Sequence, residues 1–221
     1  MSDIVVFGAG AIAEVATIYL QRDSGHRIVG YTADAAYCKS ERFCDKPVVP
    51  WETLETRFPP SQVKLLGPLS FRRMNQFRRD RYLEGKARGY SFITFVHPSC
   101  HVYTEAIGEN CFILEQNVIQ PFVHIGHNVM MWSGNHIGHH SVVGDHCFLS
   151  SQVGFSGGVV VGQGCFFGGQ TGIGAGVVIG NNCFFGERTV IVRERVPDGA
   201  VYLAQTSPRS KHDSSRLARI M

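Results

Sequence analysis

The chain has 221 residues, of which 44% are hydrophobic and 18% are charged, and its formal net charge is +3 at pH 7. This length accommodates two modest domains, and no apolar run approaches the roughly 20 residues that a membrane-spanning helix needs, so no membrane partner is expected. The N-terminus lacks the charged and apolar regions of a signal peptide, and we therefore expect a cytoplasmic protein.

A nucleotide-binding motif opens the chain. An apolar strand over residues 4–7 runs into the glycine-rich segment Gly8-Ala9-Gly10-Ala11-Ile12-Ala13, and a helix is predicted over residues 13–22. A second strand over residues 28–31 is followed by Asp34. This order matches the G-x-G-x-x-A fingerprint, in which the amides at the start of the helix bind phosphate.

We accordingly predict that Gly8, Ala9, Gly10 and Asp34 bind a nucleotide, although a tight turn that binds nothing would produce the same pattern. Fewer than a hundred residues precede the repeats described below, which is enough for one mononucleotide-sized half of a dinucleotide fold. The expected N-terminal unit is therefore an α/β, half-Rossmann-like domain over residues 1–95. It would bind a nucleotide diphosphate linked to a small group, and not NAD.

A basic amphipathic helix is predicted over residues 71–89, with Phe71, Met74, Phe77 and Tyr82 on its buried side. A solvated charged face is the simpler interpretation of its arginines. Attraction of an anionic ligand toward the glycine-rich loop is the alternative. A nucleic-acid partner is not expected, because the helix lacks interleaved aromatic residues and a recognised motif.

From residue 107 to residue 191 the chain follows a period of six. An apolar residue occupies every sixth position: Ile107, Ile113, Ile119, Ile125, Met131, Ile137, Val143, Leu149, Phe155, Val161, Phe167, Ile173, Ile179, Phe185 and Ile191. Neither a helix nor an ordinary strand has this period, whereas hexapeptide repeats are typical of parallel β-helices. Three hexapeptides make one triangular coil of about 18 residues, and successive coils stack about 4.8 Å apart. We predict that this domain covers residues 96–197 and that a C-terminal tail covers residues 198–221.

Cysteine spacing follows the same register. Cys147, Cys165 and Cys183 are 18 residues apart, and Cys111 lies two coils before Cys147. All four are predicted to point into the prism as small core residues. No CxxC pair is present, and no metal site is predicted.

Six histidines lie between residues 124 and 146, and the register separates them: His124, His127, His136, His139, His140 and His146. His139 comes two residues after the inward Ile137, so it should point outward near a corner. The positions stacked on it in later coils are Gly157 and Ala175, with further glycines beside them. We predict a groove that runs away from His139 and accepts a slim, extended ligand, although glycine also simply suits tight corners.

The repeat pattern of an aliphatic residue, glycine, two free positions and a small residue resembles the left-handed β-helix of the hexapeptide-repeat acyltransferases. Over nearly its whole length the chain is similar to their nucleotide-amino-sugar N-acetyltransferase and sialic acid O-acetyltransferase-like group. This resemblance implies an all-β left-handed parallel β-helix, a homotrimer with active sites between subunits, and acetyl-CoA as cosubstrate. Coenzyme A would lie along Gly157, Gly158, Gly174 and Ala175, and the sugar nucleotide on the N-terminal domain.

The residue that aligns best with the family's catalytic histidine is His139, which would act as general base in direct transfer to the amino group of a nucleotide-linked amino sugar. The acidic residue that often follows it in the family is His140 here, so His136 stays a second candidate. The remaining three histidines are expected to be solvated corner residues or coenzyme contacts. Alternatives are O-acetylation or transfer of a longer acyl group, and a sugar-nucleotide-binding module without chemistry. A zinc enzyme of the same fold is disfavoured, because no set of three suitably spaced histidines is present.

Overall fold

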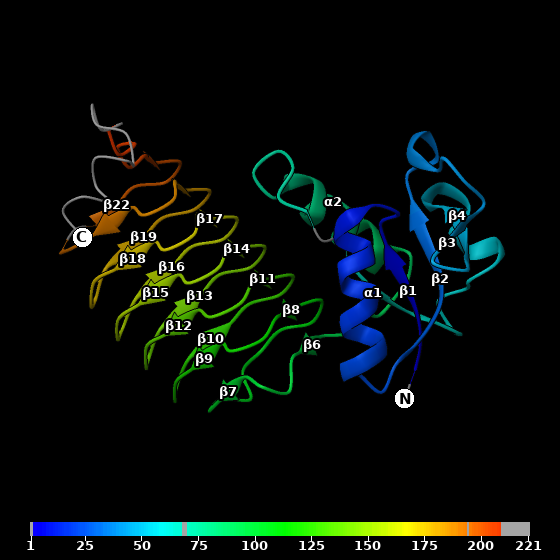
Figure 1. Cartoon of the computed structure of the whole chain (residues 1–221), viewed down its shortest axis with the longest axis horizontal. Coiled ribbons are helices and arrows are strands. Elements are labelled where there is room, and N and C mark those ends of the chain that lie inside the picture. Colours follow the sequence, from blue (N-terminus) through cyan, green and yellow to red (C-terminus); the bar gives the residue numbers. More distant parts are fainter. Residues whose placement is uncertain (1, 68–69, 194, 209–221) are drawn as a thin grey trace, which may run out of the picture.

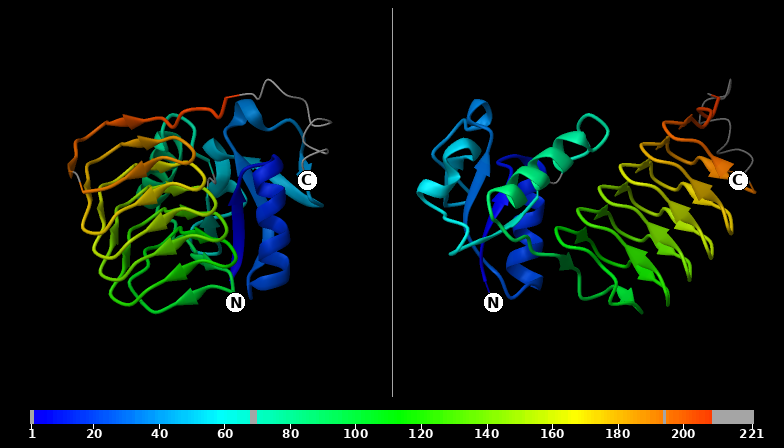
Figure 2. Two further views of the ribbon diagram at one scale, coloured as in Figure 1. Left: turned by 60° about the vertical axis from the view of Figure 1, so that its left-hand side comes forward. Right: turned by 180° about the vertical axis from the view of Figure 1, so that it is seen from behind.

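The structure, a computed structural model, describes residues 2–67, 70–193 and 195–208. A mixed α/β unit at the N-terminal end lies beside the first coils of a long triangular prism (Figure 1). The prism extends away from this unit, so that its last coils lie farthest from it (Figure 2). The expected tail falls largely outside the described residues. Within them, no helix has both the length and the apolar character to cross a membrane.

The N-terminal unit is built on a five-stranded sheet of order β3-β4-β2-β1-β5. Its central strands β1 (Asp3–Phe7) and β2 (Arg27–Ala33) are parallel and are connected through helix α1 (Ala11–Asp23). The strand, glycine-rich turn, helix and strand predicted from the motif are therefore present. Parallel strands β4 (Lys46–Pro50) and β5 (Lys64–Leu66) flank this pair, the short β3 (Arg42–Phe43) runs antiparallel to β4, and two 3₁₀ helices span Ala35–Tyr37 and Trp51–Thr56.

The prism has three faces, each a parallel sheet of two-residue strands. The docked face contains β6 (Phe95–Val96), β8 (Phe112–Ile113), β11 (Met130–Met131), β14 (Phe148–Leu149), β17 (Phe166–Phe167), β20 (Phe184–Phe185) and β23 (Val201–Tyr202). The groove face contains β7 (His101–Val102), β9 (Val118–Ile119), β12 (His136–Ile137), β15 (Gly154–Phe155), β18 (Gly172–Ile173) and β21 (Val190–Ile191). The third face contains β10 (His124–Ile125), β13 (Val142–Val143), β16 (Val160–Val161), β19 (Val178–Ile179) and β22 (Arg195–Val196).

The period-six anchors are the second residues of these strands and form the core of the prism. Ile137 pairs with Ile119 and Phe155, each 18 residues away, and all three side chains are buried. The four cysteines of the predicted inward row are also buried and are free thiols. Burial raises the pKa of the Cys111 thiol to about 12, so this side chain is an inert core residue. The repeats and their parallel pairing fit the left-handed β-helix that the sequence pattern predicts.

The end of the prism differs from the predicted one. We expected the repeats to stop at residue 197, but β23 pairs with β20 four residues beyond that point. The coils here are one residue shorter, since Val178 pairs with Arg195 and Phe184 with Val201. The strands still pair in these shorter coils, although the loss of one residue per coil removes the six-residue period from the sequence.

Helix α2 (Gln76–Ala87) is shorter than the predicted helix over residues 71–89. Arg73, Met74 and Asn75 all have positive φ angles and form a turn instead. The predicted solvated face of this helix is only partly correct, because one of the helix arginines is buried. The Arg78 side chain is completely buried, and its guanidinium donates hydrogen bonds to the carbonyl oxygens of Asn128, His146 and Cys147 at distances of 2.6–3.2 Å.

These polar contacts and an apolar layer join the two units. The Asn75 amide donates to the carbonyl oxygens of Gly164 and Cys165, both at 3.1 Å. Outward side chains of the docked face, including Phe112 and Met130, pack in one cluster with Ile4 and Leu20 of the N-terminal unit. The N-terminal unit therefore covers one face of the prism and leaves the other two uncovered within this chain.

Candidate active site

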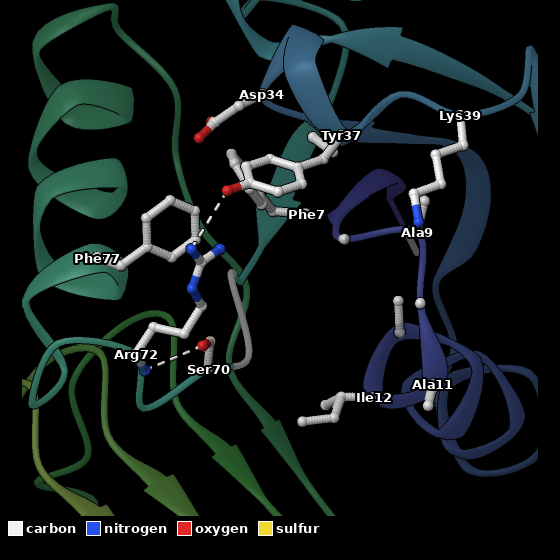
Figure 3. Close-up of a pocket in the computed structure, with 14 residues that line it drawn as sticks. Phe7, Ala9, Ala11, Ile12, Asp34, Tyr37, Lys39, Ser70, Arg72 and Phe77 are labelled. Atoms are coloured by element: carbon white, nitrogen blue, oxygen red, sulfur yellow. Dashed lines mark hydrogen bonds between the residues drawn. The ribbon is translucent and has the colours of Figure 1, made fainter.

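The glycine-rich loop borders a cavity of about 420 Å³ at the carboxyl end of β1 (Figure 3). Gly8 has a φ of 136°, and its N–H donates to the Thr32 carbonyl at 2.7 Å, which holds the turn close to β2. Gly10 precedes α1 and supplies no side-chain cap, so the first amides of this 13-residue helix are left for a ligand. All four predicted nucleotide-binding residues line this cavity: Gly8, Ala9, Gly10 and Asp34.

Asp34 makes an ion pair within the chain. Its Oδ1 accepts a hydrogen bond from Arg81 Nε of helix α2 at 2.8 Å, and both side chains are largely buried. This bond raises the pKa of Arg81. Only part of the carboxylate is therefore open to a ligand, and the motif did not predict the partner because the two residues are 47 positions apart.

Tyr37 and Lys39 also line the cavity and were not predicted, whereas Arg72, another lining residue, belongs to the basic segment over residues 71–89 that was considered as an attractor of an anionic ligand. The Arg72 guanidinium lies between two aromatic rings, 5.3 Å from the centroid of Tyr37 and 5.2 Å from that of Phe77 (Figure 3). Neither Lys39 nor Arg72 forms an ion pair with a carboxylate among the described residues. The cavity thus combines a free helix N-terminus with two unneutralised cations, an arrangement that suits a diphosphate.

His139 is exposed at the corner between the groove face and the third face, as its register predicts. Its N–H donates to Gln120 Oε1, and its carbonyl oxygen accepts from the Gly158 N–H, both at 2.8 Å. The imidazole lies over Gly157, where an added Cβ would be 2.6 Å from Cε1 and 2.7 Å from Nε2. Because Gly157 has no side chain, the His139 ring can occupy the space above it.

A hollow of about 360 Å³ lies on the groove face itself. His136, Gly154 and Gly172 occupy one outward row in register, so the two coils that follow His136 present no side chain there. Of the predicted coenzyme residues, Gly174 lines this hollow, whereas Gly157, Gly158 and Ala175 lie at the corner beside it. The second candidate base, His136, lines the hollow directly.

His127 and His146 lie at the corner between the third face and the docked face, and His124 lies on the third face. His127 Nδ1 accepts a hydrogen bond from the Glu109 N–H at 3.0 Å. His146 is buried, contrary to the expectation that it is solvated, and its Nδ1 lies 2.9 Å from the Asn128 amide nitrogen. Desolvation lowers the pKa of His146 to about 4. Among the described residues, no group of three or more His, Cys, Asp or Glu side chains is arranged to hold a metal ion.

Residues 158–193 match the model of the bacterial transferase hexapeptide (six repeats). The fold is similar to that of PerB from Caulobacter crescentus, solved with CoA and GDP-perosamine, at 23% identity and a TM-score of 0.79 over 92% of this chain and 95% of that one. It is also similar to the acetyltransferase domain of PglB from Neisseria gonorrhoeae, at 20% identity and a TM-score of 0.78 over 92% and 97% of the two chains. No curated protein matches the sequence.

A histidine-to-alanine mutant of the Caulobacter GDP-perosamine N-acetyltransferase has the same fold, at 21% identity and a TM-score of 0.67 over 92% of this chain and 94% of that one. The chain therefore carries bacterial transferase hexapeptide repeats, and over nine-tenths of its length its fold is that of PerB and of the PglB acetyltransferase domain. The predicted resemblance is confirmed at the level of repeat and fold.

Proposed function

We propose that this protein is an acetyl-CoA-dependent N-acetyltransferase that acts on the amino group of a nucleotide-linked amino sugar. The observation that carries the proposal is the imidazole of His139, which lies over Gly157 at the corner beside a hollow where Gly154 and Gly172 present no side chain. The complexes of the similar Caulobacter protein with CoA and GDP-perosamine support both substrate classes.

The acceptor occupies the N-terminal unit, which we interpret as one half of a Rossmann-like fold. Parallel strands with a glycine-rich turn after the first strand bind ligands at the carboxyl ends of those strands. The diphosphate would meet the first amides of α1, with Lys39 and Arg72 supplying compensating charge. The sugar would then project out of the cavity.

The donor lies along the groove face. A pantetheine arm is slim and extended, and Gly154 and Gly172 leave a track of matching shape on two successive coils. The thioester would lie at the end of this track that is closest to His136 and His139.

The two parts of the proposed site, the N-terminal cavity for the acceptor and the corner with His139, lie on different sides of one chain. The N-terminal unit packs on the docked face, whereas His139 occupies the opposite corner of the triangle, between the other two faces. A substrate anchored in the cavity therefore reaches an imidazole only if that imidazole belongs to another copy. We propose a homotrimer, in which the partly exposed row of Val142 and Val160 on the third face supports subunit packing.

The chemistry is direct acyl transfer. The sugar amine attacks the thioester carbonyl and its proton moves to Nε2 of His139. The carbon–sulfur bond then breaks, and the imidazolium returns the proton to the leaving sulfur, so that coenzyme A departs as the thiol. The buried cysteines cannot serve as acyl carriers, because their thiols face the interior of the prism. Backbone N–H groups near the corner would stabilise the tetrahedral oxyanion.

A thiol-release assay with acetyl-CoA and a panel of nucleotide-linked amino sugars tests the proposal. We expect turnover with at least one amino sugar and a loss of about 10²- to 10⁴-fold in kcat for His139→Ala. The His136→Ala variant serves as the comparison and should mainly raise the KM for acetyl-CoA. Turnover that survives in His139→Ala but not in His136→Ala would assign the base to His136. Turnover only with a hydroxyl in place of the amine would indicate an O-acetyltransferase.

A further inference from the structure

His139 and His140 form a hydrogen-bonded pair of imidazoles. The backbone of His140 has a φ of 58°, a left-handed conformation that turns its side chain back toward its neighbour. The two Nδ1 atoms lie 3.0 Å apart, and the ring planes are nearly perpendicular at 87°. Phe122, at the same corner of the preceding coil, packs against His140 with its ring centroid 4.6 Å away and its plane tilted by 35°. Both rings of the pair are therefore held in defined orientations.

Two facing Nδ1 atoms at this distance share one proton, so one ring donates and the other accepts. If His139 donates through Nδ1–H, its Nε2 carries a lone pair and can accept a proton. If His140 donates instead, Nε2 of neutral His139 carries the hydrogen and cannot act as a base. The Cε1–Nε2 edge of the His139 ring lies over Gly157, at 2.6 and 2.7 Å from the position of an added Cβ, whereas Nδ1 is 3.1 Å from it. No carboxylate forms an ion pair with either ring within the described parts of the chain.

We propose that His140 is a positioning residue, which accepts the Nδ1–H of His139 and so keeps Nε2 of His139 free as the base. This proposal rests on the proposed function, in which His139 takes the proton of the amine. An acceptor on the adjacent residue fixes the tautomer and direction of a catalytic imidazole, and a carboxylate often has this role. Here a neutral imidazole supplies the acceptor, and the Phe122 ring packs against it.

Two substitutions at residue 140 separate this role from a merely structural one. His140→Gly removes the acceptor, and glycine adopts the left-handed corner without strain. We expect kcat to fall by about 10- to 100-fold, the range found for residues that orient a reacting histidine, with little change in either KM. His140→Asp restores an acceptor in a residue that tolerates this backbone conformation, and should recover most of kcat. Gln152→Gly is the matched control, because Gln152 is an exposed left-handed corner residue far from the pair in the sequence.

The tautomer itself can be measured by ¹⁵N NMR of histidine-labelled protein, assigned with the His139→Ala and His140→Gly variants. We expect a proton on Nδ1 of His139 in the wild type and a shift toward the Nε2–H form in His140→Gly. A wild-type His139 with its proton on Nε2, or an unchanged kcat in His140→Gly, would overturn the proposal. This measurement needs no substrate, so it remains decisive if His139→Ala keeps its activity and the proposed base is wrong.

Discussion

At the scale of single residues, the space beside His139 is set by glycine. An added Cβ on Gly157 would overlap the imidazole at 2.6 Å, whereas one on Gly154 would meet no atom within 4 Å and would project into the hollow. On the proposed function, the two glycines would therefore affect different kinetic parameters. Gly157 would set the position of the base, and Gly154 would set the room available to the donor.

Gly157→Ala should displace the imidazole and lower kcat by about 100-fold, because a misplacement of about 1 Å can have an effect of this size. Gly154→Ala should instead raise the KM for acetyl-CoA and leave kcat nearly unchanged. Steady-state kinetics of both variants, with Gly25→Ala as a control in open space, check this separation. Equal effects of Gly157→Ala and Gly154→Ala on kcat would indicate that the donor does not bind in the hollow of the groove face.

The cations of the nucleotide cavity allow a second prediction. Arg72→Ala and Lys39→Ala should each weaken binding of a nucleoside diphosphate by about 10-fold, the value of one charge-assisted hydrogen bond. Arg79→Ala removes the same charge from exposed helix surface outside the cavity and should have little effect. Isothermal titration calorimetry measures the affinity of all three variants. An equal loss of affinity in Arg79→Ala would show that net charge, and not the position of the cation in the cavity, determines binding.

Single residues also show which parts of the candidate site could be predicted from the sequence alone. The motif placed Gly8, Gly10 and Asp34 at one cavity, and the register placed His139 outside the prism, because both patterns depend on local spacing. Lys39 had no such signal, and the basic segment that contains Arg72 did not indicate which of its cations would reach the cavity. Their roles depend on which loops meet in space, and the contact of Arg72 with Tyr37 joins residues 35 positions apart.

At the scale of elements, the predicted period identified the strands of the prism but could not determine how the N-terminal unit packs on it. Helix α2 begins at Gln76, after three residues with positive φ angles that no helical periodicity would indicate. Asn75, the last of them, and Arg78 bind carbonyl oxygens of the prism corner. The contacts that fix the start of the helix are therefore tertiary.

Arg78→Met should lower the free energy of unfolding by about 3 kcal/mol. The substitution keeps the length of the apolar stem but leaves three buried carbonyl oxygens without their charged donor. Arg79→Met, one position further along the helix on an exposed side chain, should change it by less than about 0.5 kcal/mol. Chemical denaturation followed by circular dichroism measures the difference, and equal stability of the two variants would contradict the docking role.

The corner that contains His146 should make stability depend on pH. Its pKa is about 4 in the folded chain and ordinarily 6.5, so between these values the unfolded chain binds one proton more. The contribution to stability is complete above pH 6.5 and is lost as the pH falls toward 4, at about 1.4 kcal/mol per pH unit. His146→Asn, which extends the column that Asn110 and Asn128 form at the same corner, should remove this contribution. Thermal melting of the wild type and of His146→Asn from pH 4 to pH 7 tests this prediction. Melting temperatures that depend on pH in the same way in both proteins would refute it.

At the scale of the whole molecule, the packing of the N-terminal unit is the basis of the proposed assembly. One face of the prism holds the N-terminal unit, and the opposite corner holds the imidazole pair. On the proposed function, a single chain would therefore carry the acceptor cavity and the base without joining them. The six-residue period could indicate the prism, yet it contains no information on which face the preceding domain covers. That arrangement depends on the apolar docked face, where aromatic side chains such as Phe112 and Phe148 pack outside the core of the prism.

Complementation between two impaired proteins, assayed at a nucleotide-sugar concentration well below the wild-type KM, tests this arrangement most directly. One is His139→Ala, which keeps an intact nucleotide cavity, and the other is the double variant Lys39→Ala/Arg72→Ala, which keeps an intact imidazole. When the two are unfolded together and reassembled into mixed oligomers, we predict that acetyl transfer returns, because the cavity of one chain then faces the wild-type His139 of another. Mixed oligomers that remain as inactive as their parents would contradict an active site shared between chains.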